Sequence, residues 1–193
     1  MSMIRRCVWA EKTELDQQYH DEEWGRPVHD EQRLFEMLLL EGQQAGLSWS
    51  LILAKRAHMR EAFDHFDPCI MAQYGDDKIE RLMNDSGIIR NRNKLHALVH
   101  NAQAYLRLVE KYGGLDAFLW RYVDGVPIQN QWARQEDVPD KTARSEQISK
   151  DLKAQGFKYV GSVIIYAYMQ SIGMVNDHTL DCAWHEICKN QAK

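Results

Sequence analysis

Long hydrophobic runs are missing from this chain. No apolar segment approaches the roughly 20 residues that a membrane-spanning helix needs. The N-terminus also lacks the apolar core of a secretory signal peptide. Both absences argue against a membrane or secreted protein, so the sequence predicts a cytoplasmic chain with no membrane partner.

Cysteine is scarce as well. The 193 residues include four cysteines: Cys7, Cys69, Cys182 and Cys188. In a reducing compartment such residues serve as thiols or metal ligands rather than as disulfides. Cys69 and Cys188 have no evident partner in the sequence and are predicted to be free thiols.

An excess of positive charge is also missing, because the formal net charge is −4. A negative total does not exclude nucleic acid, since binding depends on a local basic surface rather than on the sum. Residues 90–94 are locally basic, and a second group is more dispersed: Lys141, Arg144, Lys150, Lys153 and Lys158. Such runs are commonly solvated helix faces, so charge alone assigns no partner.

The alternation of apolar and polar residues that marks a strand is absent, and nearly every periodic segment has helical spacing. Longer helices are expected at about 48–63, 90–111, 115–123, 145–154 and 162–172. Residues 124–140 form the one long irregular loop. Without internal repeats or low-complexity segments, the sequence predicts a single all-α domain over residues 1–193.

One carboxylate, Glu41, falls on an apolar helix face. Leu34, Leu38 and Glu41 are spaced at i, i+4 and i+7, so their side chains share one buried face. Burying an ionised carboxylate is costly unless a cation or a hydrogen-bond donor meets it. We expect the helix to end at Gly42, and the residues up to Trp49 to bring two amides and an indole to the same turn. The alternative is a structural carboxylate that backbone groups of the helix junction satisfy.

Two predicted helices near the C-terminus are joined by a tight turn, in a helix-hairpin-helix arrangement over about 145–173. Gly156 ends the first helix, and Gly161 precedes the second. Gly161 allows a ligand to approach the backbone, and the free N–H groups at the start of the second helix suit an anion such as a DNA phosphate. The predicted DNA contacts are Lys158, Tyr159, Val160, Gly161 and Ser162. A plain αα-hairpin without a ligand is the alternative.

A possible metal site is formed by residues from both ends of the chain. Cys7 and His20 are separated by twelve residues, and His178 and Cys182 by three. The i, i+4 spacing of the second pair predicts that both side chains lie on one face of a helical turn. Two thiolates and two imidazoles match a closed tetrahedral zinc site. An ion that closes so long a loop would be structural and, with no open position, would not activate water.

A further pattern extends over nearly the whole chain. It comprises residues 7–9, 19–25, 34–37, 87–90, 156–161 and 175–178, and most specifically Glu41-Gly42-Gln43-Gln44-Ala45-Gly46-Leu47-Ser48-Trp49. In these segments the sequence resembles the 3-methyladenine DNA glycosylase I family of the helix-hairpin-helix DNA glycosylase superfamily.

The resemblance implies an enzyme that hydrolyses the N-glycosidic bond of 3-methyladenine in alkylated double-stranded DNA. It implies a structural Zn²⁺ ion with four ligands: Cys7, His20, His178 and Cys182. It also implies a pocket for the damaged base, lined by Trp9, Tyr19, Glu41 and Trp49.

The chemistry of the lesion agrees with those residues. A 3-methyladenine nucleotide carries a positive charge on its base, and stacking a desolvated cation on Trp9 or Trp49 gains about 1–2 kcal/mol. Glu41 can accept hydrogen bonds from the base, and the cation offsets the cost of burying the carboxylate. Neutral adenine would leave Glu41 uncompensated, so the pocket would reject it.

The expected reaction mechanism centres on Glu41. Asn176 stands where many members of the superfamily carry an Asp, so Glu41 is interpreted as the catalytic residue, through base recognition and stabilisation of the leaving group. Positioning of the attacking water by Glu41 is a weaker hypothesis, and Asp177 is a second candidate carboxylate. No lysine is assigned as a Schiff-base nucleophile, and Lys158 is interpreted as a phosphate contact. We therefore expect a monofunctional glycosylase.

Two other functions fit parts of the pattern. One is a catalytically silent, zinc-containing binder of damaged DNA, and the other is a zinc hydrolase of small molecules. Neither explains why Glu41, Trp9 and Trp49 occur together. The favoured prediction is a monomeric repair enzyme that acts on chromosomal DNA.

Overall fold

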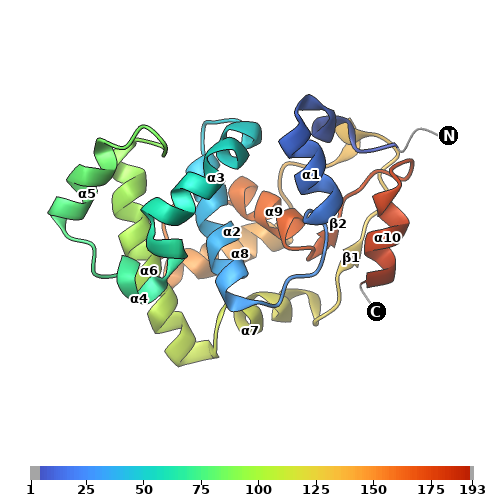
Figure 1. The fold of residues 1–193 in the computed structure, drawn as a ribbon. Helices are drawn as coiled ribbons and strands as arrows, with labels where there is room; N and C mark the ends of the chain where they lie inside the picture. The colour runs from blue at the N-terminus through green and yellow to red at the C-terminus, as the bar shows by residue number, and fades with distance from the viewer. Residues whose placement is uncertain (1–4, 192–193) are drawn as a thin grey trace.

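The computed structural model describes residues 5–191, and nearly all their regular structure is helical (Figure 1). The α-helices are α1 (Glu14–Glu22), α2 (Glu31–Gln44), α3 (Trp49–Ala62), α4 (Pro68–Met71), α5 (Asp76–Met83), α6 (Arg92–Tyr112), α7 (Leu115–Trp120), α8 (Ala143–Ala154), α9 (Ser162–Ser171) and α10 (Trp184–Gln191). Short 3₁₀ helices are η1 (Val8–Lys12), η2 (Asp64–Phe66), η3 (Arg121–Val123) and η4 (Gln135–Asp137). Over residues 5–191, no helix combines the length and the apolar character that crossing a lipid bilayer requires.

The prediction of an all-α fold is wrong in one detail. Strands β1 (Ile128–Gln129) and β2 (Val175–Asn176) pair in parallel, and so join the long loop to the segment after α9. Ile128 N donates to Met174 O at 2.9 Å, next to the paired residues. Two-residue strands are too short to produce an alternating pattern in the sequence, so periodicity could not reveal them.

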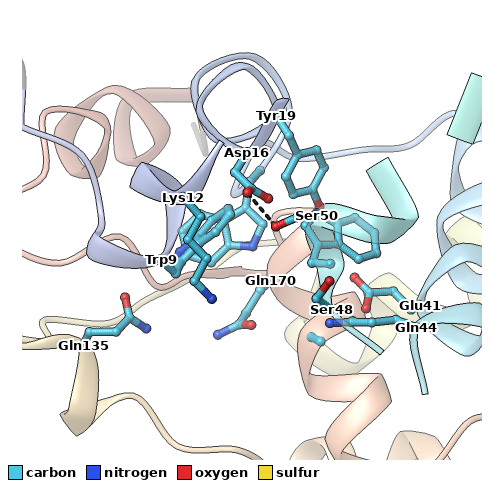
Figure 2. Close-up of a pocket in the computed structure, with 13 residues that line it drawn as sticks. Trp9, Lys12, Asp16, Tyr19, Glu41, Gln44, Ser48, Ser50, Gln135 and Gln170 are labelled. Carbon is cyan, nitrogen blue, oxygen red and sulfur yellow. Dashed lines mark hydrogen bonds between the residues drawn. The ribbon is translucent and has the colours of Figure 1, made fainter. Parts of the chain in front are cut away.

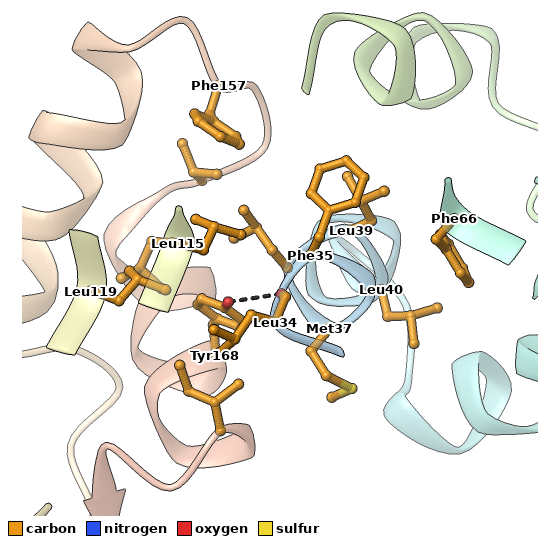
Figure 3. Packing of buried hydrophobic residues seen from close by; sticks show 14 of the residues in the cluster. Leu34, Phe35, Met37, Leu39, Leu40, Phe66, Leu115, Leu119, Phe157 and Tyr168 are labelled. Carbon is orange, nitrogen blue, oxygen red and sulfur yellow. Dashed lines mark hydrogen bonds between the residues drawn. The ribbon is translucent and has the colours of Figure 1, made fainter. Parts of the chain in front are cut away.

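Helix α2 runs through the interior of the molecule (Figures 1 and 3). Every residue from Leu34 to Gln43 is buried. Figure 3 shows Phe35 and Met37 projecting in different directions from α2 into surrounding hydrophobic side chains. Tyr168 of α9 donates its hydroxyl to Leu34 O at 2.8 Å, which fixes α9 against α2. A helix enclosed in this way can hold a carboxylate away from solvent.

The prediction that this helix ends at Gly42 is wrong. Helix α2 continues to Gln44, and the turn after it contains Gly46 at φ 78°. A Cβ atom at Gly42 would lie 3.3 Å from Tyr159 Cβ and 3.5 Å from Tyr159 O. The glycine therefore serves packing: it lets the turn between α8 and α9 approach the helix that carries Glu41.

Helices α8 and α9 form the predicted helical hairpin. Helix α8 begins before the expected residue 145, because Thr142 and Ser145 form a capping box at its N-terminus. Gly156 ends the helix with φ 97°. Asn101 of α6 then clamps the turn, since its side chain accepts from Lys158 N at 2.7 Å and donates to Lys158 O at 3.1 Å.

Candidate active site and metal centre

Four buried side chains from opposite ends of the chain converge on one point. The metal-ligating atoms of Cys7, His20, His178 and Cys182 all lie within 4.8 Å of one another. Cys182 Sγ is 3.4 Å from His178 Nδ1 and 3.5 Å from His20 Nε2, and the two nitrogens are 3.1 Å apart. A tetrahedron with normal zinc–sulfur and zinc–nitrogen bonds has edges of about 3.3–3.8 Å. The cluster therefore has the spacing of a four-coordinate metal site.

The outer nitrogens of both histidines face acceptors. His20 Nδ1 lies 2.9 Å from Asp21 Oδ1, and His178 Nε2 lies 3.3 Å from Trp24 O. Such acceptors fix the tautomer in which the other ring nitrogen is free to bind a metal. Burial also lowers the pKa of His178, which keeps its imidazole neutral. The residues thus fit a metal ion in chemistry as well as in spacing.

His178 and Cys182 do not lie on a helical turn, so the prediction from their i, i+4 spacing is wrong. They belong to the irregular segment between β2 and α10. Cys182 N donates to Thr179 O at 2.9 Å, and this tight turn brings the sulfur back toward His178. A tight turn can bring residues i and i+4 as close together as a helical turn does. The spacing of His178 and Cys182 therefore does not distinguish the two structures.

A second site is a pocket of about 360 Å³ bordered by α1, α2, α3 and α9. All four predicted base-binding residues line it: Trp9, Tyr19, Glu41 and Trp49. The ring of Tyr19 is 6.3 Å from that of Trp9 and 5.2 Å from that of Trp49. Figure 2 shows Trp9 of η1 and Tyr19 of α1 on one side of the pocket, with Glu41 of α2 across from Trp9. The pocket therefore combines aromatic walls with a carboxylate.

Four buried polar atoms of residues that line this pocket have no hydrogen-bond partner among residues 5–191: Tyr19 Oη, Glu41 Oε2, Trp49 Nε1 and Gln135 Oε1. Glu41 is only 3% exposed. A buried polar group without a partner costs about 1–3 kcal/mol. Two donors and two acceptors without partners around one pocket indicate a binding site for a polar ligand.

Burial shifts the ionisation of the two acidic groups. It raises the pKa of Glu41 to about 8, against an opposing effect of the Ser171 hydroxyl. Burial and then the Glu41 charge raise the pKa of Tyr19 well above its usual value, so its hydroxyl stays protonated at neutral pH. A cation in the pocket would favour the ionised form of Glu41. Together with the aromatic walls, this favours a flat, positively charged ligand.

Comparison with known proteins identifies the family. The family model described as methyladenine glycosylase matches residues 9–186. The chain belongs to the methyladenine glycosylase family.

Relatives of this glycosylase family match over nearly their whole length. The chain is 44% identical over 179 residues to DNA-3-methyladenine glycosylase 1 of Escherichia coli (strain K12), covering 93% of this chain and 96% of that protein. It is 46% identical over 180 residues to DNA-3-methyladenine glycosylase of Haemophilus influenzae, with coverages of 93% and 97%. A solved variant of 3-methyladenine DNA glycosylase I in complex with 3-methyladenine superposes with a TM-score of 0.89 at 39% identity, covering 92% and 96%. The family resemblance noted in the sequence is thus confirmed.

Several residues of the glycosylase pocket were not predicted: Lys12, Asp16, Trp24, Gln44, Ser48, Ser50, Gln135, Ala167 and Gln170. Asp16 could have been found, because it precedes Tyr19 by three residues and shares its helix face. Gln135 and Gln170 come from distant segments, and nothing in their local sequence indicates a pocket.

Asp177, the second candidate carboxylate, does not line the pocket of this glycosylase. It is buried, and its two oxygens accept from four donors: Asn130 Nδ2 (2.6 Å), Trp132 Nε1 (2.8 Å), Tyr166 Oη (2.7 Å) and Gln170 Nε2 (2.8 Å). These bonds hold the loop that contains β1 against α9. The role of Asp177 is structural.

The predicted DNA contacts of the glycosylase are divided between surface and core. Lys158 is exposed, and Gly161 and Ser162 begin α9. The Tyr159 backbone has a positive φ of 55°. The Val160 side chain is buried and its carbonyl accepts from Ser149, so it can offer a ligand only its backbone N–H.

The basic stretch 90–94 is not a free cationic surface. Lys94 is buried and donates to Gln43 O and Ala45 O, both at 2.7 Å. It therefore caps the C-terminal end of α2, whose carbonyls carry partial negative charge. Arg92 pairs with Glu80 on α5. Most of this local charge serves helix packing.

Proposed function

We propose that this chain is a DNA repair enzyme that hydrolyses the N-glycosidic bond of 3-methyladenine in alkylated DNA and leaves an abasic site. The observation that carries the proposal is the buried Glu41 carboxylate between aromatic walls, whose Oε2 has no hydrogen-bond partner among residues 5–191. A 3-methyladenine nucleotide offers what this pocket lacks: a flat positive ring that can stack, donate and accept. A relative in this family has been solved in complex with 3-methyladenine, which supports the same ligand here.

The enclosed position of the pocket requires the nucleotide to leave the duplex. Glu41 and Tyr19 are each at most 3% exposed, so no base within a stacked helix can reach them. Glycosylases meet this requirement by turning the target nucleotide out of the stack. Extrusion costs least for a damaged base that pairs poorly, and this adds to the selectivity of the pocket.

The pocket residues then recognise the base and hold it as it leaves. The positive ring stacks on Trp9 or Trp49, and its charge offsets the cost of ionising Glu41. Tyr19 and the Trp49 indole offer hydrogen bonds to the base acceptors. Neutral adenine would leave the Glu41 carboxylate uncompensated and would bind more weakly. Stabilising the departing base lowers the barrier to breaking a bond that the positive charge has already weakened.

We assign structural zinc to the cluster formed by Cys7, His20, His178 and Cys182. A closed set of two thiolates and two imidazoles suits Zn²⁺, which would add folding free energy rather than activate water. Two ligands adjoin pocket residues: Cys7 precedes Trp9 by two residues, and His20 directly follows Tyr19. The Trp9 ring also lies 5.5 Å from the His20 ring. Metal binding would thus fix two walls of the base pocket.

The DNA backbone is proposed to contact the turn between α8 and α9. Gly161 has an ordinary φ of −62°, and a Cβ there would meet no described atom within 4 Å. Gly161 is the N-cap residue of α9, and the open space around it would also allow an external phosphate to approach the backbone closely. The N–H groups at the start of α9 and the exposed Lys158 would bind that phosphate. Lys12, exposed at the pocket edge, offers a second cation for the extruded nucleotide.

Release of free 3-methyladenine from methylated duplex DNA tests the proposal, with the parent chain compared with Glu41→Gln. We expect the parent to release the base and the variant to lose at least about 100-fold in rate, as for removal of a stabilising polar group in an active site. Borohydride should trap no covalent adduct, because the reaction is simple hydrolysis. Tight binding of damaged DNA by the parent without base release would favour a silent binding module instead.

A further inference from the structure

The base pocket contains a second carboxylate, Asp16. It lies on α1 one turn before Tyr19, lines the same pocket as Glu41, and is 1% exposed. Figure 2 shows the two carboxylates apart, with Asp16 beside Ser50 and Glu41 on α2. A ligand in the pocket therefore meets negative groups from two different helices.

Asp16 is held in place by hydroxyl groups on one side only. Its Oδ2 accepts from Thr13 Oγ1 at 2.8 Å and from Ser50 Oγ at 2.7 Å. Its Oδ1 accepts no hydrogen bond from residues 5–191, and no cationic side chain in that range lies within salt-bridge distance. Oδ1 therefore keeps its capacity to accept a hydrogen bond from a ligand in the pocket.

Helix capping explains part of this arrangement but not all of it. Thr13 caps α1, and Asp16 occupies the third helical position, where acidic side chains favour the helix N-terminus. Capping accounts for the bond to Thr13. It does not account for the bond to Ser50 of α3, which turns the carboxylate toward the pocket.

We propose that Asp16 is a specificity-determining residue that, together with Glu41, selects positively charged bases. The inference rests on the proposed function and deepens it. A cationic ring held by Glu41 lies in the field of both carboxylates, and a low-dielectric pocket strengthens this attraction. A neutral ring gains nothing from Asp16. The positive charge is on the base in the bound ground state and moves only as far as the sugar in the transition state, so the attraction acts in both states and contributes to binding rather than to the chemical step.

Binding of two small bases tests the charge preference without catalysis. The cation 3,9-dimethyladeninium models the base of the damaged nucleotide, and 9-methyladenine is its neutral counterpart. Quenching of tryptophan fluorescence would report both, since Trp9 and Trp49 line the pocket. We expect Asp16→Asn to bind the cation about tenfold more weakly, because one charge–charge attraction is lost. The variant should bind the neutral base as before. An equal loss for both bases, or no loss, would overturn the proposal.

Kinetics on methylated duplex DNA separates recognition from chemistry. We expect Asp16→Asn to raise KM about tenfold while kcat stays within about twofold, as when ground-state and transition-state binding fall together. Ser50→Ala should produce a smaller change in the same direction and serves as the second test should Asp16→Asn fold poorly. The control Asp77→Asn changes net charge equally on an exposed helix end and should have no effect.

A fall in kcat at unchanged KM would contradict the recognition role. A parent that releases no 3-methyladenine but still prefers the cation would refute the proposed function and leave this inference standing.

Discussion

At the scale of single residues, Glu41 shows how one buried group can link stability to recognition. Its carboxylate lies on the interior side of α2, and Oε2 has no partner among residues 5–191. The protein folds despite the cost of burying this group because burial raises the pKa of Glu41 to about 8, which favours the protonated form at neutral pH. The burial of Glu41 also makes the pocket sensitive to the charge of a ligand, because a bound cation favours the ionised form of Glu41.

This linkage predicts an unusual pH dependence of stability. Burial raises the Glu41 pKa from 4.5 to about 8. Between these values the folded protein keeps a proton that the unfolded chain releases, so the contribution of Glu41 to stability is greatest below about 4.5 and falls as the pH rises toward 8. Each pH unit costs at most about 1.4 kcal/mol.

Urea unfolding of the parent and Glu41→Gln from pH 5 to pH 8 checks this expectation. The variant lacks the titrating group and shares all others, so the difference between the two free energies of unfolding isolates Glu41. We expect the parent to lose stability relative to the variant as the pH rises. Parallel pH profiles would show that Glu41 titrates normally in the folded chain.

At the scale of secondary-structure elements, helical periodicity predicted the long helices because each presents a continuous apolar face to the core. Periodicity could not predict that α2 passes through Gly42, since a glycine reads as a helix end unless the packing partner is known. Tyr159, which lies more than a hundred residues further along the chain, supplies that partner. The β1–β2 pair and the turn around Cys182 also depend on tertiary contacts between short segments, so local sequence could not reveal them.

The Gly42 contact leads to a prediction about DNA binding. Gly42→Ala gains up to about 1 kcal/mol in helix propensity but forces the turn near Tyr159 to move by a few tenths of an ångström. We expect the free energy of unfolding to change by less than about 1 kcal/mol, because the two effects oppose each other. KM for methylated DNA should rise several-fold, because the displaced turn carries the proposed phosphate contact.

Two measurements, KM and the urea midpoint, separate these effects. Gly75→Ala is the matched control, because Gly75 is exposed at the start of α5 and a Cβ there meets no described atom within 4 Å. An unchanged KM in Gly42→Ala would show that the turn does not contribute to DNA binding.

At the scale of the whole molecule, the sequence predicted four pocket residues and four metal ligands from two kinds of signal: Glu41 and the Cys and His pairs are chemically unusual for their positions, whereas Trp9 and Tyr19 were assigned through the family resemblance. A carboxylate among leucines and paired Cys and His residues are visible without coordinates. The residues that complete the pocket are ordinary glutamines and serines, and only the fold brings them together. Asp177 shows the reverse case, a carboxylate that seemed catalytic in the sequence but whose oxygens are fully used by internal donors.

Metal removal should act on the whole molecule, because the cluster connects residues near both ends of the chain. We expect a chelator, applied in mild denaturant, to lower the free energy of unfolding by several kcal/mol, and added Zn²⁺ to restore it. Base release should be lost together with stability, since Trp9 and Tyr19 adjoin two ligands. Cys182→Ala should reproduce the chelated state, and the exposed Cys69→Ala should not. Unchanged stability in chelator, with no metal in the purified protein, would contradict a structural ion.

Net charge is the last whole-molecule constraint on the proposed function, because a chain of formal charge −4 would have to bind a polyanion. Many exposed cations are already neutralised by neighbours, as in the pairs Arg92–Glu80 and Lys189–Glu186. We expect Lys12→Gln and Lys158→Gln each to reduce the slope of log K against log salt by about 0.9, the value for one phosphate contact. Lys189→Gln, which removes a paired cation on α10, should leave the slope unchanged. If all three variants shift the slope alike, the long-range field of the protein, rather than contacts at the pocket edge and the hairpin turn, controls DNA binding.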